Sequence, residues 1–581
     1  MKKRWRVLDS EKKIDVSEFP DLHEVAAVLF ANRKISEAKE ARAFLKPDWD
    51  CGIHDPFLFS GMRDAVARTL TALESGERIT IHGDYDADGV TGSTVVITTL
   101  REIEKLVWAR LPRTGRENPA PTQIDFYIPH RDKEGYGLRL ETVQLLKDRG
   151  TSLLITVDCG IANVEEIAAA REAGMDVIVL DHHRFGDELP NAINIHPGLP
   201  NESYPFKHLA AVGVAWKFCS ALITESRSRG FAIPEGWEKW LLDLVSIATV
   251  TDMVPLTGEN RVLLTYGLKV LNKTRRIGLQ QLIEISGRKL GEITARDVGF
   301  SLGPRINAAG RMDHAELALQ LMMSESFDEA EELSEKLELH NRERQRVVEE
   351  MFIVAESRKI DGAISVLWDS SWSPSLVGLV AGRFLERTGK PCVAIGKYGD
   401  AWIGSGRSVA SYDITEAVRR AGEGLLTRVG GHIQACGFSF VDDSFAPLLA
   451  ERLRVDADER LSSENLLPEL LIDSELLFSD LSFQLIETVN CFQPFGIGNP
   501  EPLFLTRRLS VFDVSTVGNG GKHLRLTLKS PEGFFQKFIG FGMGDRRVEL
   551  EKGVLIDVVY NIGANEWNGR KEIQCKLVDF Q

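Results

Sequence analysis

Cysteine, basic charge and long hydrophobic stretches are all scarce in this sequence. The seven cysteines are widely scattered and never spaced Cys-x-x-Cys, which excludes a zinc knuckle and a disulfide framework. This usage is typical of reduced thiols in the cytoplasm. No stretch approaches about 18 uninterrupted apolar residues, so no membrane span is expected. The basic first residues precede Asp, Glu and Lys rather than the apolar segment of a signal peptide, so export is not expected.

Acidic residues outnumber basic residues along most of the chain. Lys and Arg together number 70, Asp and Glu number 85, and the net charge is −15. No general basic surface is therefore available to nucleic acid, and a polyanion must meet a local patch or bound cations. Residues 501–581 are the exception, with twelve Lys and Arg against ten Asp and Glu.

Two common enzyme motifs are also missing. No Gly-x-x-x-x-Gly-Lys-[Ser/Thr] loop is present, which argues against ATP-driven work. No serine or cysteine stands in a nucleophile-elbow sequence, so a covalent intermediate on such a residue is not expected.

The 581 residues are enough for three or four domains. Between residues 78 and 256 short apolar runs alternate with helical patterns, which predicts a doubly wound α/β domain with a parallel sheet. A charged stretch without Gly or Pro then predicts a long connecting helix. A smaller α/β pattern follows, and short alternating strands at the end predict a β-barrel or sandwich. The expected divisions are residues 1–60, 61–325, 326–360, 361–458 and 459–581.

Three carboxylates stand at alternate positions directly after the first predicted strand. Asp84, Asp86 and Asp88 precede a helical pattern that begins near Val90. Such charges repel one another unless a cation lies among them, although an acidic turn that caps a helix is an alternative interpretation. The alternation also resembles a calcium loop, but the helix-side Glu of an EF-hand is missing.

Further Asp and His residues follow other elements of the same predicted domain. Asp158 ends one predicted strand, the run 181–183 (Asp-His-His) ends the next, and Asp252 ends an apolar helix, where its charge opposes the helix dipole. Parallel strands deliver their carboxyl ends to one edge of the sheet, so these side chains are expected to meet. Packing requires no such coincidence, and the pattern therefore predicts a metal site.

Carboxylates and imidazoles without a thiolate favour manganese or magnesium over zinc. The number of acidic groups is sufficient for two ions that share a bridging carboxylate. Two such ions about 3.5–4 Å apart would stabilise both the attacking and the leaving oxygen of an in-line phosphoryl displacement. Phosphoester hydrolysis is the predicted chemistry.

These segments resemble a known superfamily. His82–Gly89, Asp158–Gly160, the run 181–183 and Thr251–Met253 resemble the four motifs of the DHH phosphoesterases. Two further segments narrow the resemblance: Gly303–Met312, and Gly430–Ala435, which is similar to the signature of the DHH-associated substrate domain. Phe495–Pro502 opens the β-rich region. In this order, over residues 60–581, they resemble the RecJ family of bacterial exonucleases, which degrade single-stranded DNA from its 5′ end. The resemblance implies that the β-rich region is an OB-like nucleic-acid-binding barrel.

The resemblance also implies roles for individual residues. Asp158 would bridge the two ions, His183 would approach the scissile phosphate, and Asp181 would orient its neighbour. The implied metal ligands are His82, Asp86, Asp88, Asp158, His182 and Asp252. The implied substrate-binding residues are Arg305, Asn307, Arg311, Arg407, Ser408 and His432.

One segment departs from the family pattern. Where the family commonly has Trp-His-x-Gly-Val-Ile-Gly, residues 372–378 read Trp-Ser-Pro-Ser-Leu-Val-Gly, so that Ser373 and Ser375 replace a His and a Gly. The resemblance places both positions on the second domain's face of the cleft. The family's substrate contacts are therefore not carried over there, whereas the metal motifs are intact and hydrolysis is expected to survive.

The leading hypothesis is metal-dependent hydrolysis of single-stranded DNA from the 5′ end, with release of mononucleotides, in cytoplasmic DNA repair and recombination. A single-strand-binding protein and a helicase are the partners that this function implies. One alternative is a DHH phosphodiesterase acting on short oligoribonucleotides or cyclic dinucleotides, although such enzymes usually end after the second domain. Another is a non-catalytic single-strand-binding scaffold, which loss of the metal carboxylates would mark.

Overall fold

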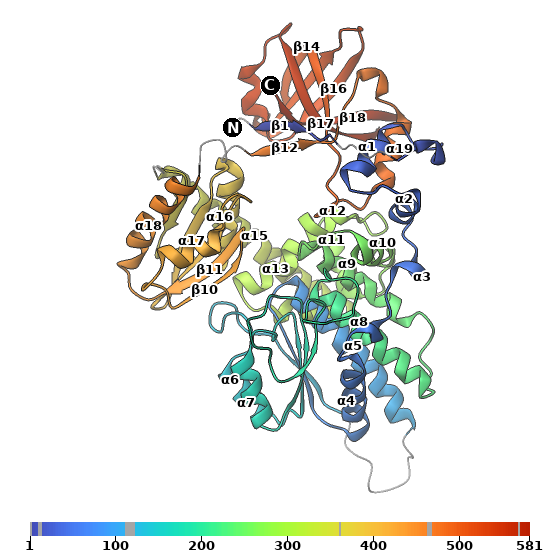
Figure 1. Ribbon diagram of the computed structural model, residues 1–581, viewed down its shortest axis with the longest axis vertical. Coiled ribbons are helices and arrows are strands. Elements are labelled where there is room, and N and C mark those ends of the chain that lie inside the picture. The colour runs from blue at the N-terminus through green and yellow to red at the C-terminus, as the bar shows by residue number, and fades with distance from the viewer. Residues whose placement is uncertain (1–2, 10–13, 111–121, 359–361, 462–467, 568–569) are drawn as a thin grey trace. The chain divides into compact units, whose positions relative to one another are not determined.

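The computed structural model describes residues 3–9, 14–110, 122–358, 362–461, 468–567 and 570–581 (Figure 1). The chain divides into two compact units, each treated separately below. The first unit is Trp49–Leu467, and the second combines Lys2–Asp48 with Pro468–Gln581. No helix among the described residues is both long and apolar enough to cross a bilayer.

The first unit begins with a five-stranded parallel sheet, which confirms the predicted doubly wound domain. Its strands run in the spatial order β3-β2-β4-β5-β6, and every neighbouring pair is parallel. Strands β2 and β4 are buried along their whole length because helices cover both faces of the sheet. The strands are β2 (Ile79–Gly83), β3 (Ile124–Tyr127), β4 (Leu153–Val157), β5 (Asp176–Leu180) and β6 (Ile193–Ile195).

The helices of this domain lie on the two faces of the sheet (Figure 1). α6 (Leu140–Asp148) and α7 (Val164–Glu172) pack on one face, where Leu154, Val177 and Val179 form a core with them. The other face carries the larger core and is covered by α4 (Met62–Ser75), α5 (Ala87–Arg110), α8 (Ala211–Ser228) and α9 (Leu242–Thr251). Strand order reverses between β2 and β4, and ligands of such sheets bind beyond the carboxyl ends at this point.

A helical region joins the sheet domain to the next one. The predicted connecting helix is α15 (Phe327–Ser357), and the Ser326 side chain caps it by accepting from the Glu329 amide. Ion pairs one turn apart, such as Lys336 with Glu332, support its exposed face. The preceding helices are α10 (Gly258–Leu271), α11 (Ile277–Ile285), the short π-helical segment η4 (Val298–Leu302), α13 (Gly303–Met312) and α14 (Glu316–Met323).

A smaller α/β domain completes the first unit, as predicted. Its mixed sheet has the order β10-β11-β9-β8-β7, in which only β7 and β8 are parallel. The strands are β7 (Ser365–Trp368), β8 (Cys392–Tyr398), β9 (Ala401–Arg407), β10 (Arg428–His432) and β11 (Ala435–Phe440). The helices are α16 (Pro374–Thr388), which shares a core with the end of α15, and α17 (Ile414–Ala421) and α18 (Phe445–Arg460).

The second unit contains a closed β-barrel, which confirms the expected OB-like domain. Five strands neighbour one another in the order β14-β15-β16-β18-β17, and β17 pairs back onto β14. Alternate residues of β15, such as Leu524, Leu526 and Leu528, point into the core. The strands are β14 (Phe504–Val517), β15 (His523–Lys529), β16 (Phe535–Gly540), β17 (Leu555–Trp567) and β18 (Arg570–Phe580).

The N-terminal residues are an integral part of this second unit. β1 (Arg4–Val7) pairs in parallel with β12 (Glu469–Ile472), and Phe30 of α1 (Val25–Asn32) packs 4.8 Å from the Phe492 ring. The buried Arg33 forms an ion pair with Asp473, and its Nε donates to Asn499 Oδ1 at 2.7 Å. Asn499 belongs to the segment 495–502 noted in the sequence, so that segment forms part of a buried junction.

Candidate metal centre

The acidic segment after β2 turns sharply into α5. Asp86 Oδ1 accepts from the amides of Asp88 and Gly89 at 2.8 and 3.2 Å, and so caps the start of the helix. A Cβ at Gly89 would lie 2.4 Å from the Asp84 carbonyl oxygen, so only glycine allows this close turn. Both Asp88 oxygens accept from amides at the start of α8, at 2.7 and 2.8 Å. Backbone amides therefore fix two of the three carboxylates.

Asp158 follows β4 and adopts the left-handed backbone conformation, with φ of 62°. This conformation is costly for a residue other than glycine and is found where the surrounding structure requires it. The Asp158 side chain is 2% exposed, and its Oδ1 lies 3.3 Å from His182 Nε2 and 3.6 Å from His183 Nδ1. The turn therefore directs a buried carboxylate at two imidazoles.

Asp181 shapes the turn that follows β5. Its Oδ1 accepts from the amides of His182 and His183, at 2.7 and 3.1 Å, and lies 2.9 Å from His183 Nδ1. Its Oδ2 accepts from the Ile161 amide. Although burial opposes ionisation, these partners lower the pKa of Asp181 to about 2. The same contact outweighs the effect of burial on His183 and raises the pKa of this imidazole to about 9.

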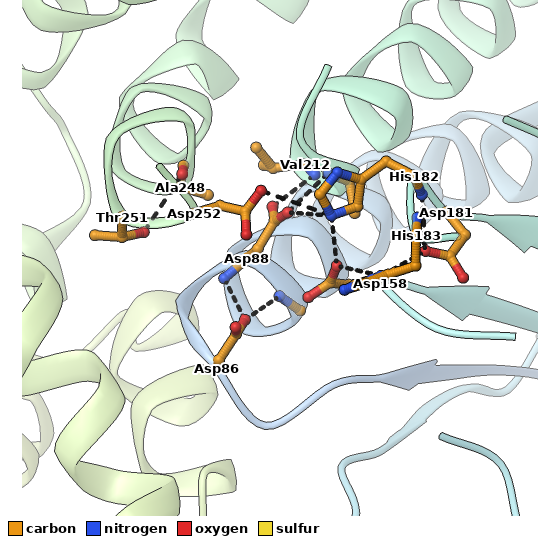
Figure 2. A network of polar contacts seen from close by, with 12 residues as sticks. Asp86, Asp88, Asp158, Asp181, His182, His183, Val212, Ala248, Thr251 and Asp252 are labelled. Carbon is orange, nitrogen blue, oxygen red and sulfur yellow. Dashed lines mark hydrogen bonds and ion pairs between the residues drawn. The ribbon is translucent and has the colours of Figure 1, made fainter. Parts of the chain in front are cut away.

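His182 Nε2 is the point at which the carboxylates converge (Figure 2). Besides Asp158, the Asp252 Oδ2 and Asp88 Oδ2 atoms lie 3.6 and 3.8 Å from it. Asp252 reaches this position from the C-terminal end of α9, although the helix dipole disfavours a negative charge there. Residues from four separate segments thus meet at the carboxyl edge of the sheet, at its topological switch point.

Several buried polar atoms of this cluster have no hydrogen-bond partner. Leaving such atoms unpaired costs free energy, so each requires an explanation. They are His82 Nε2, Asp84 Oδ1, Asp158 Oδ1, His182 Nε2 and Asp252 Oδ2. Divalent cations would satisfy carboxylate oxygens and unprotonated imidazole nitrogens together, and the donor set suits manganese or magnesium. The residues present therefore fit a metal centre.

The pKa values show the same unbalanced charge. Burial, followed by the charge of Asp86, raises the pKa of Asp84 to about 8 and that of Asp88 to about 7. Burial and neighbouring carboxylates also raise the pKa of Asp158 and of Asp252 well above the usual range. Burial and the charge of His183 lower the pKa of His182 to about 4, so this imidazole is neutral near pH 7 and free to act as a ligand.

The described residues form three groups whose ligand atoms lie within 4.8 Å of one another. The groups are Asp158 with His182 and His183, Asp88 with His182 and Asp252, and Asp84 with Asp86 and Asp158. Five of the six expected ligands are therefore brought together. Asp84 was not among the expected ligands, although the alternate spacing of the three carboxylates was a signal for it.

His82 is the expected ligand that stands apart from these groups. It is fully buried in β2, and its ring stacks on Tyr127 with centroids 5.7 Å apart. Its Nδ1 lies 3.4 Å from Cys159 Sγ, whereas Nε2 has no partner. A role for His82 as a ligand stays a prediction, as do the individual roles of the other expected site residues.

The expected substrate residues of α13 have different surroundings. Asn307 Oδ1 accepts from the Ala87 amide at 2.7 Å and so supports the acidic turn. Arg311 Nη1 donates to the Ser375 carbonyl oxygen at 2.6 Å. Arg305 instead forms an ion pair with Glu338 of α15 at 2.7 Å. Of the three side chains, Arg305 is thus already paired within the protein, by a carboxylate of the connecting helix.

The expected substrate residues of the smaller domain lie at the ends of β9 and β10. Arg407 Nη1 donates to Ser405 Oγ and to the Gly406 carbonyl oxygen. Ser408 is buried, and its hydroxyl donates to the Tyr412 carbonyl oxygen. His432 is exposed; partial burial and the nearby charges of Arg184 and His183 lower its pKa. A role for His432 in substrate binding stays a prediction.

Two residues at the site were not expected from the sequence. Both belong to the loop of residues 129–138, between β3 and α6. Tyr136 donates to the Asp158 carbonyl oxygen at 3.0 Å, and its hydroxyl lies 3.1 Å from His183 Nδ1. The Arg131 guanidinium lies 4.5 Å from the Tyr85 ring centroid. Glycines 135 and 137 flank Tyr136, and both have positive φ, as a tight loop requires.

Three known domain families match the chain. The N-terminal domain of the DHH family matches residues 78–249, the DHHA1 domain matches residues 359–457, and the RecJ OB domain matches residues 472–579. The fold and the acidic, imidazole-rich centre therefore define a DHH-type protein with a candidate metal site.

Full-length relatives narrow the assignment. The single-stranded-DNA-specific exonuclease RecJ of Bacillus subtilis is 36% identical over 100% of this chain and 71% of the relative. Its counterpart in Salmonella typhimurium is 32% identical, over 100% of this chain and 99% of the relative. A crystal structure of RecJ with Mn2+ from Thermus thermophilus matches with a TM-score of 0.82 at 29% identity and covers 100% of this chain and 79% of that one. The chain belongs to the RecJ family, as its motifs indicated.

Proposed function

We propose that this chain is a metal-dependent exonuclease that hydrolyses single-stranded DNA. The convergence of buried, unpartnered carboxylate and imidazole atoms at the sheet edge is the observation that carries the proposal. It occurs in a member of a family whose curated relatives are named single-stranded-DNA-specific exonucleases. Site and family therefore point to the same chemistry.

Two divalent cations, Mn2+ or Mg2+, would occupy this centre. Asp84, Asp86 and Asp158 offer ligand atoms to one ion, and Asp88, His182 and Asp252 offer them to another. When bound, such ions stabilise negative charge on phosphoryl oxygens and make water a better nucleophile at neutral pH. RecJ of Thermus thermophilus has been crystallised with each of these metals.

His183 is the residue of the cluster best suited to touch a phosphate. Its side chain is 35% exposed, more than the side chains of Asp158, Asp181 or His182. With a pKa of about 9, the imidazole is protonated at pH 7 and can donate a hydrogen bond to a phosphoryl oxygen. Asp181 holds the ring in place, and Tyr136 braces the same nitrogen.

Three guanidinium groups provide a site for the DNA backbone next to this cluster. Burial and the charges of Arg131 and Arg344 lower the pKa of Arg311 to about 9, and burial together with Arg131 also lowers the pKa of Arg407. Among the described residues, Arg131, Arg311 and Arg407 form no ion pair within 4.0 Å. Phosphate oxygens would neutralise these arginines without reading base sequence. Their position supports the proposed substrate class.

Several finer features of the proposal rest on the family resemblance alone. They are the 5′→3′ direction, the release of mononucleotides, the role in repair and recombination, the cytoplasmic location, and the partnership with a single-strand-binding protein and a helicase. The division into a DHH domain (61–325), a connecting helix, a DHH-associated domain (361–458) and an OB-like domain (459–581) is proposed on the same basis.

The alternatives have less support. A phosphodiesterase for short oligoribonucleotides does not account for the match of residues 472–579 to the RecJ OB domain. A non-catalytic scaffold does not account for an intact set of metal carboxylates.

The test is digestion of a 5′-labelled oligodeoxynucleotide with Mn2+. We expect rapid release of labelled mononucleotide from a single strand and little from a duplex. A block at the 5′ end should stop digestion, whereas a block at the 3′ end should not. Activity confined to oligomers of two to five nucleotides would favour the phosphodiesterase instead.

A further inference from the structure

Ser375, one of the two departures from the family pattern, bonds to two segments of the metal-bearing domain. It lies at the start of α16 in the smaller domain and is 3% exposed. Its hydroxyl donates to Asp132 Oδ1 in the loop of residues 129–138. Its carbonyl oxygen accepts from Arg311 Nη1 at 2.6 Å. All three residues lie in the first unit, and this one serine therefore joins its two domains.

The charge of Asp132 is well placed for this contact. α16 is 15 residues long, and its N-cap, Ser373, makes no side-chain capping bond. The N-terminus of a helix attracts a negative charge because several amides there lack partners. Asp132 supplies that charge from another domain, and the Ser375 hydroxyl gives the attraction a direction. A glycine at position 375 would leave the attraction but remove the hydrogen bond.

The loop that carries Asp132 is braced internally. Glu134 accepts from the His130 amide at 2.7 Å and from the Tyr127 hydroxyl at 2.6 Å. The Glu134 carbonyl oxygen also accepts from Arg139 Nε. A restraint at Asp132 therefore acts on the whole loop, including its neighbours Arg131 and Tyr136.

The restraint on the loop opposes electrostatic repulsion between Arg131 and nearby arginines. Arg131 lies close enough to Arg311 and Arg407 for its charge to affect the pKa of both. Before a polyanion binds, the like charges of Arg131 and Arg407, which belong to different domains, favour separation of the loop from the smaller domain. A hydrogen bond between Asp132 and Ser375 opposes that separation at the residue adjacent to Arg131.

We propose that Ser375 is a positioning residue: by holding Asp132, it keeps Arg131 and Tyr136 over the metal centre and so strengthens binding of single-stranded DNA. The inference rests on the proposed function for its consequence, but the restraint itself can be tested without metal or DNA. The hydroxyl touches no reacting atom, and Asp181 still holds the His183 ring when the loop loosens, so the hydrolytic step at saturating DNA should be unaffected.

The first experiment measures hydrogen exchange of the metal-free, DNA-free protein. The Glu134 and Gly135 amides donate within the loop, to the carbonyl oxygens of His130 and Arg131. In Ser375→Ala we expect peptides covering residues 129–138 to exchange about fivefold faster, because the loop opens more often. The matched control is Ser371→Ala, which removes a serine–aspartate hydrogen bond within the smaller domain. Equal exchange in the parent and Ser375→Ala would overturn the proposal.

The second experiment separates KM from kcat on a 5′-phosphorylated single strand with Mn2+. We expect Ser375→Ala to raise KM about fivefold and to leave kcat within about twofold, since only binding is weakened. Asp132→Ala should have a similar effect, and the double variant should be no worse than either single variant. Additive effects, or a fall in kcat alone, would contradict the proposal. If the parent itself fails to hydrolyse DNA, the proposed function is wrong, while the exchange result still decides whether the restraint exists.

Discussion

The two compact units differ in how far apart in sequence their key partners lie. In the first unit each contribution to the metal centre is a short run directly after a strand or helix, such as Asp84–Asp88 after β2. In the second unit the decisive contacts join the two ends of the chain, and Arg33 and Asp473 are 440 positions apart. A site formed by residues at the ends of strands and helices can be recognised from short sequence motifs. A core formed by segments far apart in the sequence cannot.

The two units also differ in the property that a substitution is expected to affect most. The first unit holds unpartnered charges that a cation would satisfy, so its side chains are arranged for chemistry at some cost in stability. The second unit satisfies its buried arginine with Asp473, Asn499 and the Pro500 carbonyl oxygen. We therefore expect substitutions in the first cluster to change catalysis most, and substitutions in the second to change folding most.

The largest effect should come from Asp158→Ala. This carboxylate belongs to two of the three ligand groups. Its loss removes a ligand of one proposed ion and, because its Oδ1 lies 3.3 Å from His182 Nε2, alters the surroundings of a ligand of the other. Hydrolysis of single-stranded DNA should fall by on the order of 10⁴-fold, as expected for loss of two-metal catalysis. DNA binding without metal should stay within a few-fold of the parent. Single-turnover digestion and fluorescence anisotropy measure the two quantities.

The exposed Asp187, which also follows β5, provides the matched control for this change. Asp187→Ala removes the same charge near the same sheet edge and should leave the rate unchanged. If Asp158→Ala digests DNA as fast as the parent, the metal assignment is wrong.

The second prediction concerns Asp84, which the sequence comparison with the family left out. Asp84→Asn keeps the shape but removes the charge from a group with Asp86 and Asp158. Hydrolysis should fall on the order of 10³-fold, and the midpoint of Mn2+ activation should move to higher concentration. Titration of activity with Mn2+ and calorimetry of Mn2+ binding to the free protein test this.

Asp125→Asn is the control for Asp84→Asn, because Asp125 pairs with Arg78 at the start of the sheet, away from the strand ends that carry the site. Its Mn2+ titration should match that of the parent. A parental rate and a parental Mn2+ midpoint in Asp84→Asn would limit the centre to the ligands that the sequence motifs indicated.

Sequence patterns alone were sufficient for most of the first unit. The acidic and histidine runs after β2, β4 and β5 do meet at one edge of the sheet, as expected. Parallel strands explain this success, since their carboxyl ends must lie together. Arg131 and Tyr136 were missed because only tertiary packing brings their loop over the site. The unusual Ser375 was noticed, but nothing local could reveal Asp132 as its partner.

The second unit was only partly predictable for a related reason. Short alternating strands indicated the barrel, but not that residues 504–517 form one long strand, β14. This strand has an irregular register near Arg508, whose φ is 57°. The contribution of the N-terminal residues had no local signature, because β1 and Arg33 pair with residues that lie beyond residue 468 in the sequence.

The third prediction tests the second unit directly. Arg33→Ala leaves Asp473 buried without its cationic partner and Asn499 without a donor. Breaking a buried pair on one side costs about 3 kcal/mol, so the unfolding free energy of the second unit should fall by that amount. Arg42→Ala removes an exposed pair with Glu18 and should cost below about 0.5 kcal/mol. Urea denaturation, followed by probes in each unit, should show the first unit unchanged; an equal loss in both variants would mean that Arg33 is not a core residue.

The smallest predicted effect is a pH dependence confined to the first unit. Asp84 and Asp88 have folded-state pKa values of about 8 and 7, above their ordinary value, because burial and Asp86 disfavour their ionised forms. The folded state therefore binds more protons than the unfolded state between about pH 4 and pH 8, and without metal the stability conferred by these groups is lost as pH rises through that range.

His182 acts in the opposite direction, since its pKa of about 4 lies below its ordinary value, but only between about pH 4 and 6.5. Above pH 6.5 the carboxylates dominate, and the metal-free first unit should melt at a lower temperature at pH 8 than at pH 6.5. Added Mn2+ should bind roughly tenfold more tightly at pH 8, because it displaces fewer protons from its ligands there. Calorimetry in two buffers of different ionisation enthalpy would detect more proton release at pH 6.5 than at pH 8. Equal Mn2+ affinity at both pH values would show that these carboxylates are not the groups that bind the ion. A melting temperature of the second unit that does not change with pH would sharpen the contrast between a site with unpartnered charges and a core whose buried charge is paired.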